Sequence, residues 1–157
     1  MSNVILKIKT PALMSKTSLL LVMLATFLCL SADIAKSAAP VKVLVFGDSL
    51  SAGFGLAKPD AFPVVLEAAL KKAGRNVALI NAGVSGDTTA GGRARLAWTL
   101  TDKPAVVILE LGANDGLRGL EPSETRANLD AILSELGKRD ITVLLTGMLA
   151  PPNLGKE

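Results

Sequence analysis

The 157-residue sequence contains no histidine, no tyrosine, a single cysteine and only 3% aromatic residues. One cysteine, Cys29, can build neither a disulfide framework nor a thiolate metal site. Cofactor signatures are also missing, because the chain has no Walker-type lysine motif and Gly53 and Gly55 lack the third glycine of a dinucleotide fingerprint. We therefore expect no metal and no cofactor. The lack of histidine removes the commonest general base of enzyme active sites.

An excess of charge is missing too, once the N-terminus is set aside. The net charge is +3, but four lysines and one aspartate lie in residues 1–39, which leaves 13 basic and 13 acidic residues from position 40 onward. Nucleic-acid binding needs a basic surplus and often stacking aromatic side chains. The composition therefore predicts no nucleic-acid partner.

Residues 1–39 have the layout of a secretory signal peptide. Lys7, Lys9 and Lys16 precede an apolar run over 19–30, and small residues follow at 37–39. The run is shorter than the roughly 20 residues that span a bilayer. We predict a signal peptide over 1–39 that is cleaved rather than retained as an anchor. The protein is then extracytoplasmic, either periplasmic or secreted, with no stable membrane span after cleavage.

From residue 41 onward, short apolar runs rich in β-branched residues alternate with stretches of helical period. Strands that are apolar on both faces are typical of buried parallel sheets, and an alternating order of strands and helices implies right-handed crossovers with helices on both faces. The sequence therefore predicts one α/β domain over 40–157, a three-layer α/β/α structure with a flavodoxin-like parallel sheet. The expected strands are 41–46, 77–80, 105–111 and 141–146.

Helices are expected between these strands. The first follows Asp60 as N-cap and stops at Gly74. The second covers 90–100, although Gly91 and Gly92 oppose it, and Trp98 is expected to lie in the core. The third runs from about Ser123 to Gly137. Residues 148–157 lead to no further element, so we expect an incomplete domain that lacks its last helix-strand-helix portion.

Three loops that follow strands carry small residues beside hydroxyl, amide or carboxylate groups. They are Gly47-Asp48-Ser49-Leu50-Ser51, Asn81-Ala82-Gly83-Val84-Ser85-Gly86-Asp87 and Gly112-Ala113-Asn114-Asp115-Gly116. Ligands of open α/β sheets bind beyond the carboxyl ends of the strands. The backbone N–H groups of Ser49 and Gly86 and the Asn114 amide could therefore converge on one developing oxyanion. Each loop taken alone is also an ordinary turn, and it is their joint occurrence that favours a site.

These three blocks, with the third extended to Glu110–Gly119, resemble the GDSL or SGNH hydrolase family, especially its bacterial arylesterase, acyl thioesterase and lysophospholipase branch. The resemblance covers about 41–155. It implies that Ser49 is the nucleophile and that Ser49 N–H, Gly86 N–H and the Asn114 side chain form the oxyanion hole. It also implies that Asp48 supports the turn and that Asp115 orders its loop.

The sequence departs from that family at the general base. The family's last block is an aspartate and a histidine three residues apart, and these 157 residues contain no histidine. A serine hydroxyl without such a base is a poor nucleophile. Two interpretations follow, a truncated esterase and a complete pseudoenzyme that only binds, and we expect the truncated esterase. The chain as given is predicted to be inactive.

The substrate expected from the resemblance is a small acyl or aryl ester or thioester, hydrolysed through an acyl-enzyme. Six apolar side chains after the strands could form an apolar surface that contacts an acyl group, or could pack over the sheet instead: Phe54, Leu56, Leu117, Leu120, Met148 and Leu149. One alternative is a glycan O-acetyl esterase, although the polar and aromatic rim residues that such a substrate would favour are scarce. A second is a non-catalytic, flavodoxin-like ligand-binding module. A flavin is an unfavourable ligand for it, because the charge of Asp48 lies where the flavin phosphate would bind and because tyrosine is absent.

Overall fold

A computed structural model describes residues 38–148. Residues 1–37 of the predicted signal peptide and residues 149–157, which include the apolar candidate Leu149, lie outside the described residues. In the part of the chain that is described, no helix is both long enough and apolar enough to cross a membrane.

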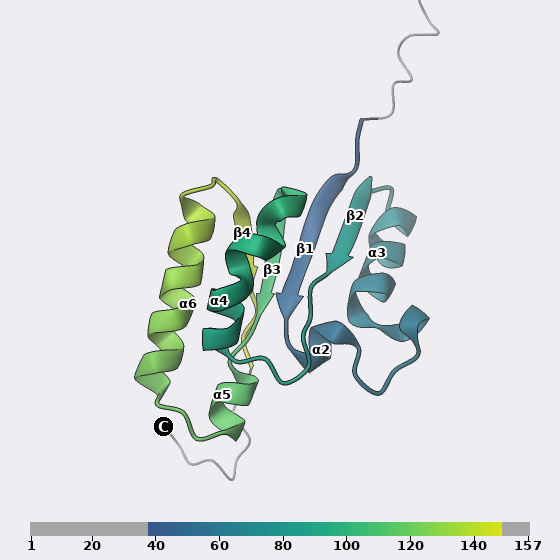
Figure 1. The fold of residues 1–157 in the computed structure, drawn as a ribbon. Helices are drawn as coiled ribbons and strands as arrows, with labels where there is room; N and C mark the ends of the chain where they lie inside the picture. The colour runs from purple at the N-terminus through teal and green to yellow at the C-terminus, as the bar shows by residue number, and fades with distance from the viewer. Residues whose placement is uncertain (1–37, 149–157) are drawn as a thin grey trace, which may run out of the picture. The chain divides into compact units, whose positions relative to one another are not determined.

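The centre of the fold is a four-stranded sheet in which all strands are parallel (Figure 1). Its order is β2-β1-β3-β4, so the first strand lies inside the sheet and the chain crosses over it between β2 and β3. The predicted strand positions and the parallel arrangement are confirmed. The strands are β1 (Val41–Gly47), β2 (Val77–Asn81), β3 (Val106–Glu110) and β4 (Thr142–Leu145).

Helices cover both faces of the sheet, which makes the three layers. Successive side chains of a strand point to opposite faces, and β1 therefore places Leu44 and Phe46 on one face and Val43 and Val45 on the other. The first face packs against α4 (Thr89–Thr99) and α6 (Pro122–Gly137), and the second against α3 (Phe62–Lys72). The larger core lies on the first face and consists of Leu44, Phe46, Leu96, Leu100, Val107, Leu109, Ile132 and Leu136.

Helix α4 forms as predicted, and its two glycines lie in close contact with neighbouring side chains. A Cβ atom on Gly92 would lie 2.4 Å from Leu111 Cδ1, and one on Gly91 would lie 2.1 Å from Asp87 Oδ1. The expectation for Trp98 is wrong, because 77% of this residue is exposed. Leu96 is the residue that faces the core, and two positions along a helix amount to a rotation of about 200°. Trp98 therefore points away from the core that Leu96 faces.

Helix α3 ends near Gly74 as predicted, but Asp60 is not its N-cap. The cap is Ala61, which makes no side-chain hydrogen bond, and Pro63 occupies the first turn, where a proline is tolerated. Asp60 is instead the last residue of a short 3-10 helix, η2 (Lys58–Asp60), which ends at the same Ala61. Asp60 therefore has the backbone conformation of the 3-10 turn and not the extended conformation that is typical of an N-cap residue.

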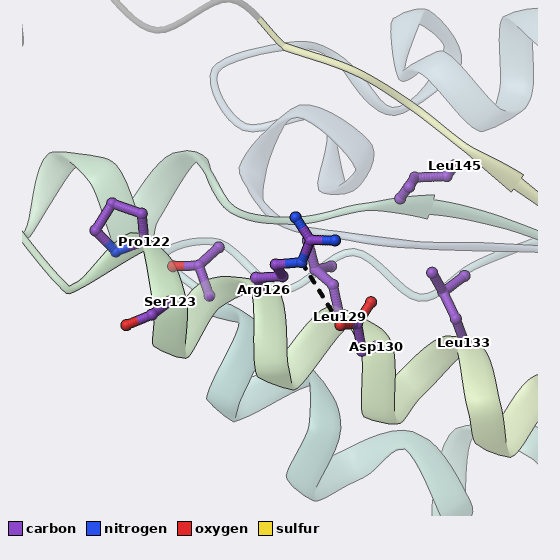
Figure 2. A pocket seen from close by; sticks show the side chains of 8 residues that line it. Pro122, Ser123, Arg126, Leu129, Asp130, Leu133 and Leu145 are labelled. Atoms are coloured by element: carbon purple, nitrogen blue, oxygen red, sulfur yellow. Dashed lines mark ion pairs between the residues drawn. The ribbon is translucent and has the colours of Figure 1, made fainter. Parts of the chain in front are cut away.

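Two short helices lie at the edge where β1 and β3 end, namely α2 (Ser49–Ala52) and α5 (Ala113–Leu117) (Figure 1). A further 3-10 helix, η3 (Leu100–Asp102), follows α4. A separate groove of about 530 Å³ lies between α6 and β4, and Figure 2 shows Leu129 and Leu133 on the side of α6 that faces Leu145. The candidate catalytic residues do not line this groove.

Candidate active site

Ser49 is the first residue of α2 and lies two positions after Gly47, the last residue of β1. The preceding residue, Asp48, is the N-cap, and its Oδ1 accepts a hydrogen bond from Leu50 N–H at 3.0 Å. Asp48 is 1% exposed, whereas Ser49 is half-buried. The buried carboxylate therefore supports the turn, as expected, and the neighbouring serine remains accessible.

Asn114 connects the three loops. Its amide Nδ2 donates one hydrogen bond to Asp48 Oδ2 at 3.0 Å and another to the backbone oxygen of Asp87 at 2.9 Å. Asp48 directly precedes Ser49, and Asp87 directly follows Gly86. The structure thus brings the three sequence-predicted residues to one edge of the sheet, with Asn114 bonded to a chain neighbour of each of the other two.

Gly86 has a left-handed backbone, with φ at 79°, a conformation that glycine adopts at little cost. Its carbonyl oxygen accepts a hydrogen bond from Arg118 Nη2 at 2.6 Å. Arg118 is the residue that caps the C-terminus of α5, so this bond links the loop after β2 to the loop after β3. Arg118 is exposed and leaves a positive charge at the rim of the site.

Arg95 of α4 connects the loop after β1 to the loop after β2. Its Nε pairs with Asp87 Oδ2 at 2.7 Å, its Nη2 donates to the backbone oxygen of Gly47 at 3.1 Å, and its guanidinium carbon lies 4.1 Å from the centre of the Phe46 ring. The two side chains of the ion pair are 19% and 11% exposed. Charge-assisted bonds of this kind are stronger than neutral ones, especially where water is partly excluded.

Asp115 is 2% exposed and serves the packing of the loop after β3. Its carboxylate accepts hydrogen bonds from Thr89 N–H at 2.9 Å, from Thr89 Oγ1 at 2.5 Å and from Thr125 Oγ1 at 3.3 Å. It therefore fastens α5 to the first turns of α4 and α6. This agrees with the ordering role that the resemblance implied. These bonds direct the Asp115 carboxylate toward Thr89 and Thr125 and not toward Ser49.

Glu110 ends β3 and lies opposite Gly47 in the sheet register. Its Oε2 accepts hydrogen bonds from Asp48 N–H at 3.2 Å and from Ser51 Oγ at 2.8 Å. Burial raises the pKa of Glu110, while the bonds from Ser51 and Asp48 act in the opposite direction and the charge of Asp48 adds to the increase. Oε1 is buried without a hydrogen-bond partner.

The apolar candidates around this edge are exposed rather than packed over the sheet. The exposed fraction is 77% for Phe54 and 69% for Leu117, and Leu50, next to Ser49, is 59% exposed. Leu56, Leu120 and Met148 are exposed as well. Exposed apolar side chains near polar groups are typical of sites for small organic ligands.

Comparison with known proteins identifies the family. The sequence profile of the GDSL-like lipase/acylhydrolase family matches residues 45–157. The chain belongs to this family. Among curated members it is 43% identical, over 137 residues, to an arylesterase of Vibrio mimicus, and 38% identical, over 122 residues, to thioesterase 1/protease 1/lysophospholipase L1 of Escherichia coli.

The family's solved structures include AlinE4, an SGNH-hydrolase family esterase, to which this chain is 53% identical with a TM-score of 0.74. The matches cover 87%, 77% and 77% of this chain for the arylesterase, the Escherichia coli protein and AlinE4. They cover 67%, 57% and 66% of those proteins, respectively. The predicted SGNH fold is thus confirmed, and the chain spans about three fifths to two thirds of these family members.

Sequence reasoning missed Glu110 and Arg95 as parts of this site. Glu110 was visible as a charged residue inside an otherwise apolar strand, Ala105–Leu111, which is a signal of a buried polar role. Arg95 carried no such signal, because charged residues are ordinary on helices. Its role depends on the close approach of α4 to the sheet, where Gly92 lies next to Leu111 and Phe46.

Proposed function

We propose that this chain carries the nucleophile and the oxyanion donors of a serine esterase. The substrate class is a carboxylic ester or thioester of a small acyl or aryl group, as in an arylesterase, thioesterase or lysophospholipase. The observation that supports this most directly is the pair of Asn114 hydrogen bonds, which joins the serine loop and the Gly86 loop at one edge of the sheet.

The reaction we propose begins with attack of Ser49 Oγ on the carbonyl carbon of the ester. The Ser49 proton passes to a base, and the carbonyl oxygen gains a negative charge that the N–H groups of Ser49 and Gly86 and the Asn114 amide stabilise. Collapse of this intermediate breaks the bond to the alcohol or thiol, which takes the proton and leaves. Water then attacks the acyl-enzyme by the same route and releases the carboxylic acid.

Asn114 must change partners to serve as an oxyanion donor. An amide –NH₂ has two hydrogens, and here they are directed to Asp48 Oδ2 and to the Asp87 carbonyl. We propose that one of these bonds is shared with, or replaced by, the oxyanion in the reaction. The remaining bond would keep the amide oriented, which is the preorganisation that gives oxyanion holes their effect.

These 157 residues contain no histidine that could serve as the base. Glu110 is bound to Ser51 and Asp48, and Asp115 to Thr89 and Thr125, so neither acidic residue is hydrogen-bonded to Ser49. We propose that turnover requires a histidine oriented by an aspartate, the arrangement that the family resemblance implies. The exposed apolar side chains Leu50, Phe54 and Leu117 support an acyl or aryl substrate.

We also propose that the protein is exported and acts outside the cytoplasm. The basis is the lysine-flanked apolar run that ends before small residues at 37–39. N-terminal sequencing of protein recovered from outside the cytoplasm should begin between about Ala38 and Val41. An intact Met1 on soluble cytoplasmic protein would contradict export.

The function can be tested with an extended chain, defined as residues 38–157 joined in register to the C-terminal segment of the Vibrio mimicus arylesterase, including the aspartate and histidine expected of the family. We expect this chain to hydrolyse p-nitrophenyl butyrate and to react with a fluorophosphonate at Ser49, detected by mass spectrometry of the labelled peptide. Ser49→Ala should abolish both, because the hydroxyl is the reacting group.

The matched control is Ser134→Ala, which removes an exposed hydroxyl on α6. It should leave turnover and labelling unchanged. Turnover that survives in Ser49→Ala would show that the nucleophile is assigned wrongly. A folded extended chain that binds the ester without hydrolysing it would favour the non-catalytic binding module instead.

A further inference from the structure

Glu110 holds the serine turn on both sides of Ser49. The N–H of Asp48 and the hydroxyl of Ser51 both donate to the same oxygen, Oε2, at 3.2 and 2.8 Å. Ser51 is 1% exposed, so this hydrogen bond is shielded from water. The four-residue turn is therefore tied to the end of β3, four residues before Asn114 along the chain.

The chain leaves room for this carboxyl group. A Cβ atom on Gly47 would lie 2.5 Å from Glu110 Oε2 and 2.2 Å from Ser51 Oγ, so any other residue there would displace the pair. The second oxygen, Oε1, is buried without a hydrogen-bond partner, which is costly for a polar atom. A carboxyl group kept here despite this cost and its desolvation calls for a role beyond packing.

We propose that Glu110 is a positioning residue of the esterase site, an inference that rests on the proposed function. Its Oε2 fixes the turn from Asp48 to Ser51 relative to the strand that leads to Asn114. The Ser49 hydroxyl and N–H and the Asn114 amide are thereby held to face the same substrate carbonyl. Glu110 touches neither the substrate nor the reacting atoms. Because small misplacements in an active site reduce rates strongly, loss of this bond pair acts on kcat rather than on substrate binding.

The test uses four single variants and the Glu110→Ala/Ser51→Ala double variant of the extended chain with p-nitrophenyl butyrate. Glu110→Ala removes the acceptor, Glu110→Gln retains an acceptor oxygen without the charge, and Ser51→Ala removes one of the two donors. Glu135→Ala is the control, because Glu135 forms only exposed ion pairs on α6 with Lys138 and Arg139. Burst amplitude in stopped-flow measurements counts the intact sites in each preparation.

We expect Glu110→Ala to lower kcat per intact site by about tenfold to a hundredfold, with KM little changed. Glu110→Gln should restore most of kcat, since a side-chain oxygen again accepts both bonds. Ser51→Ala should lower kcat by a smaller factor, and its effect should disappear in the Glu110→Ala background, because the two residues act through one hydrogen bond. Glu135→Ala should behave like the unsubstituted chain.

Unchanged kcat per intact site in Glu110→Ala would overturn the inference, and so would a loss confined to burst amplitude, which marks a purely structural role. Failure of Glu110→Gln to restore kcat would also overturn it, by showing that charge rather than placement matters. Where Glu110→Ala does not fold, Ser51→Ala decides, and full kcat in that variant contradicts the proposal. Absence of Ser49-dependent turnover in the unsubstituted chain is a different result, since it rejects the proposed function together with this inference.

Discussion

Asn114 is the residue on which the proposed oxyanion hole depends most, because its amide bonds both other loops. Replacing it with alanine in the extended chain removes one oxyanion donor and both tethers. We expect kcat for p-nitrophenyl butyrate to fall by about a hundredfold to a thousandfold. Asn128→Ala is the control, since that amide lies on α6 and bonds Arg93 and Thr89 instead. A loss of less than tenfold in Asn114→Ala would contradict the assignment.

Glu110 also predicts a pH dependence of stability. Its pKa in the folded protein is raised from the model-compound value of 4.5, mainly by burial, so the folded state favours the neutral carboxyl group. The stability contributed by that neutral group is present below pH 4.5 and is lost as the pH rises through the raised pKa. Glu110→Gln cannot titrate. We therefore expect the free energy of unfolding of the extended chain, relative to that of its Glu110→Gln variant, to be larger near pH 4 than near pH 7, which means a more stable chain at the lower pH.

Urea unfolding of both proteins at these two pH values measures this difference directly. Equal differences at pH 4 and pH 7 would show that the carboxyl group does not change its protonation preference on folding. The opposite slope, with the unsubstituted chain gaining stability toward pH 7, would show that the hydrogen bonds from Ser51 and Asp48 outweigh burial.

The residues of the site differ in how far the sequence reveals them. Ser49, Gly86 and Asn114 stand in local motifs that follow strands, so a pattern within a few residues is enough to find them. Glu110 bonds Asp48 and Ser51, which lie 62 and 59 positions away in the chain, and Arg95 bonds Gly47, 48 positions away, as well as the nearer Asp87. Such bonds depend on strand register and on the distance between helix and sheet, which a local pattern does not contain.

At the scale of secondary-structure elements, α4 offers the clearest test of packing. Gly92→Ala in the extended chain places a methyl group 2.4 Å from Leu111 Cδ1 and 3.4 Å from an edge carbon of the Phe46 ring. We expect a loss of about 1–3 kcal/mol in the free energy of unfolding, the usual cost of overpacking a core. The measurement is urea unfolding followed by circular dichroism.

Gly137→Ala is the matched control at the end of α6, where an added Cβ atom meets nothing within 4 Å. It should raise stability by about 0.4–1 kcal/mol, because alanine reduces the freedom of the unfolded chain. A gain in both variants would show that α4 can move away from the sheet. In that case the position of Arg95, which contacts Gly47 and Asp87, would also be in doubt.

The elements themselves were largely predictable, and the errors have physical causes. The order of strands and helices and the stop at Gly74 follow from apolar period and turn residues. Asp60 was misassigned because two short helical segments meet at Ala61, which a capping pattern does not resolve. Trp98 was misassigned because its aromatic side chain suggests burial, whereas the rotation of α4 is set by Leu96 and Gly92.

For the whole molecule, the sheet explains both the position of the site and a weakness of the structure. The strand order places the ends of β1, β2 and β3 side by side, which brings their three loops together. On the other side, β4 is paired with β3 alone among residues 38–148, and Leu144 and Leu145 are 57% and 48% exposed. The apolar groove in Figure 2 opens beside them.

This combination predicts how residues 38–157 behave when they are produced by themselves. Exposed leucines on a strand edge and an open apolar groove favour association and loose packing. We expect a broad thermal transition and strong binding of a hydrophobic dye, in contrast to a sharper transition for the extended chain. Substituting Leu144 and Leu145 with threonine should reduce dye binding, because threonine keeps a β-branched side chain on the strand while removing apolar surface.

The same preparation should show no hydrolysis of p-nitrophenyl butyrate above background. With no histidine among these residues, the Ser49 proton has only water to accept it, and loss of a catalytic unit of this kind can lower kcat by roughly a millionfold. The extended chain, assayed in parallel, is the positive control. A sharp unfolding transition together with turnover that Ser49→Ala abolishes would contradict this prediction, because it would require that these 157 residues contain a base able to activate the serine.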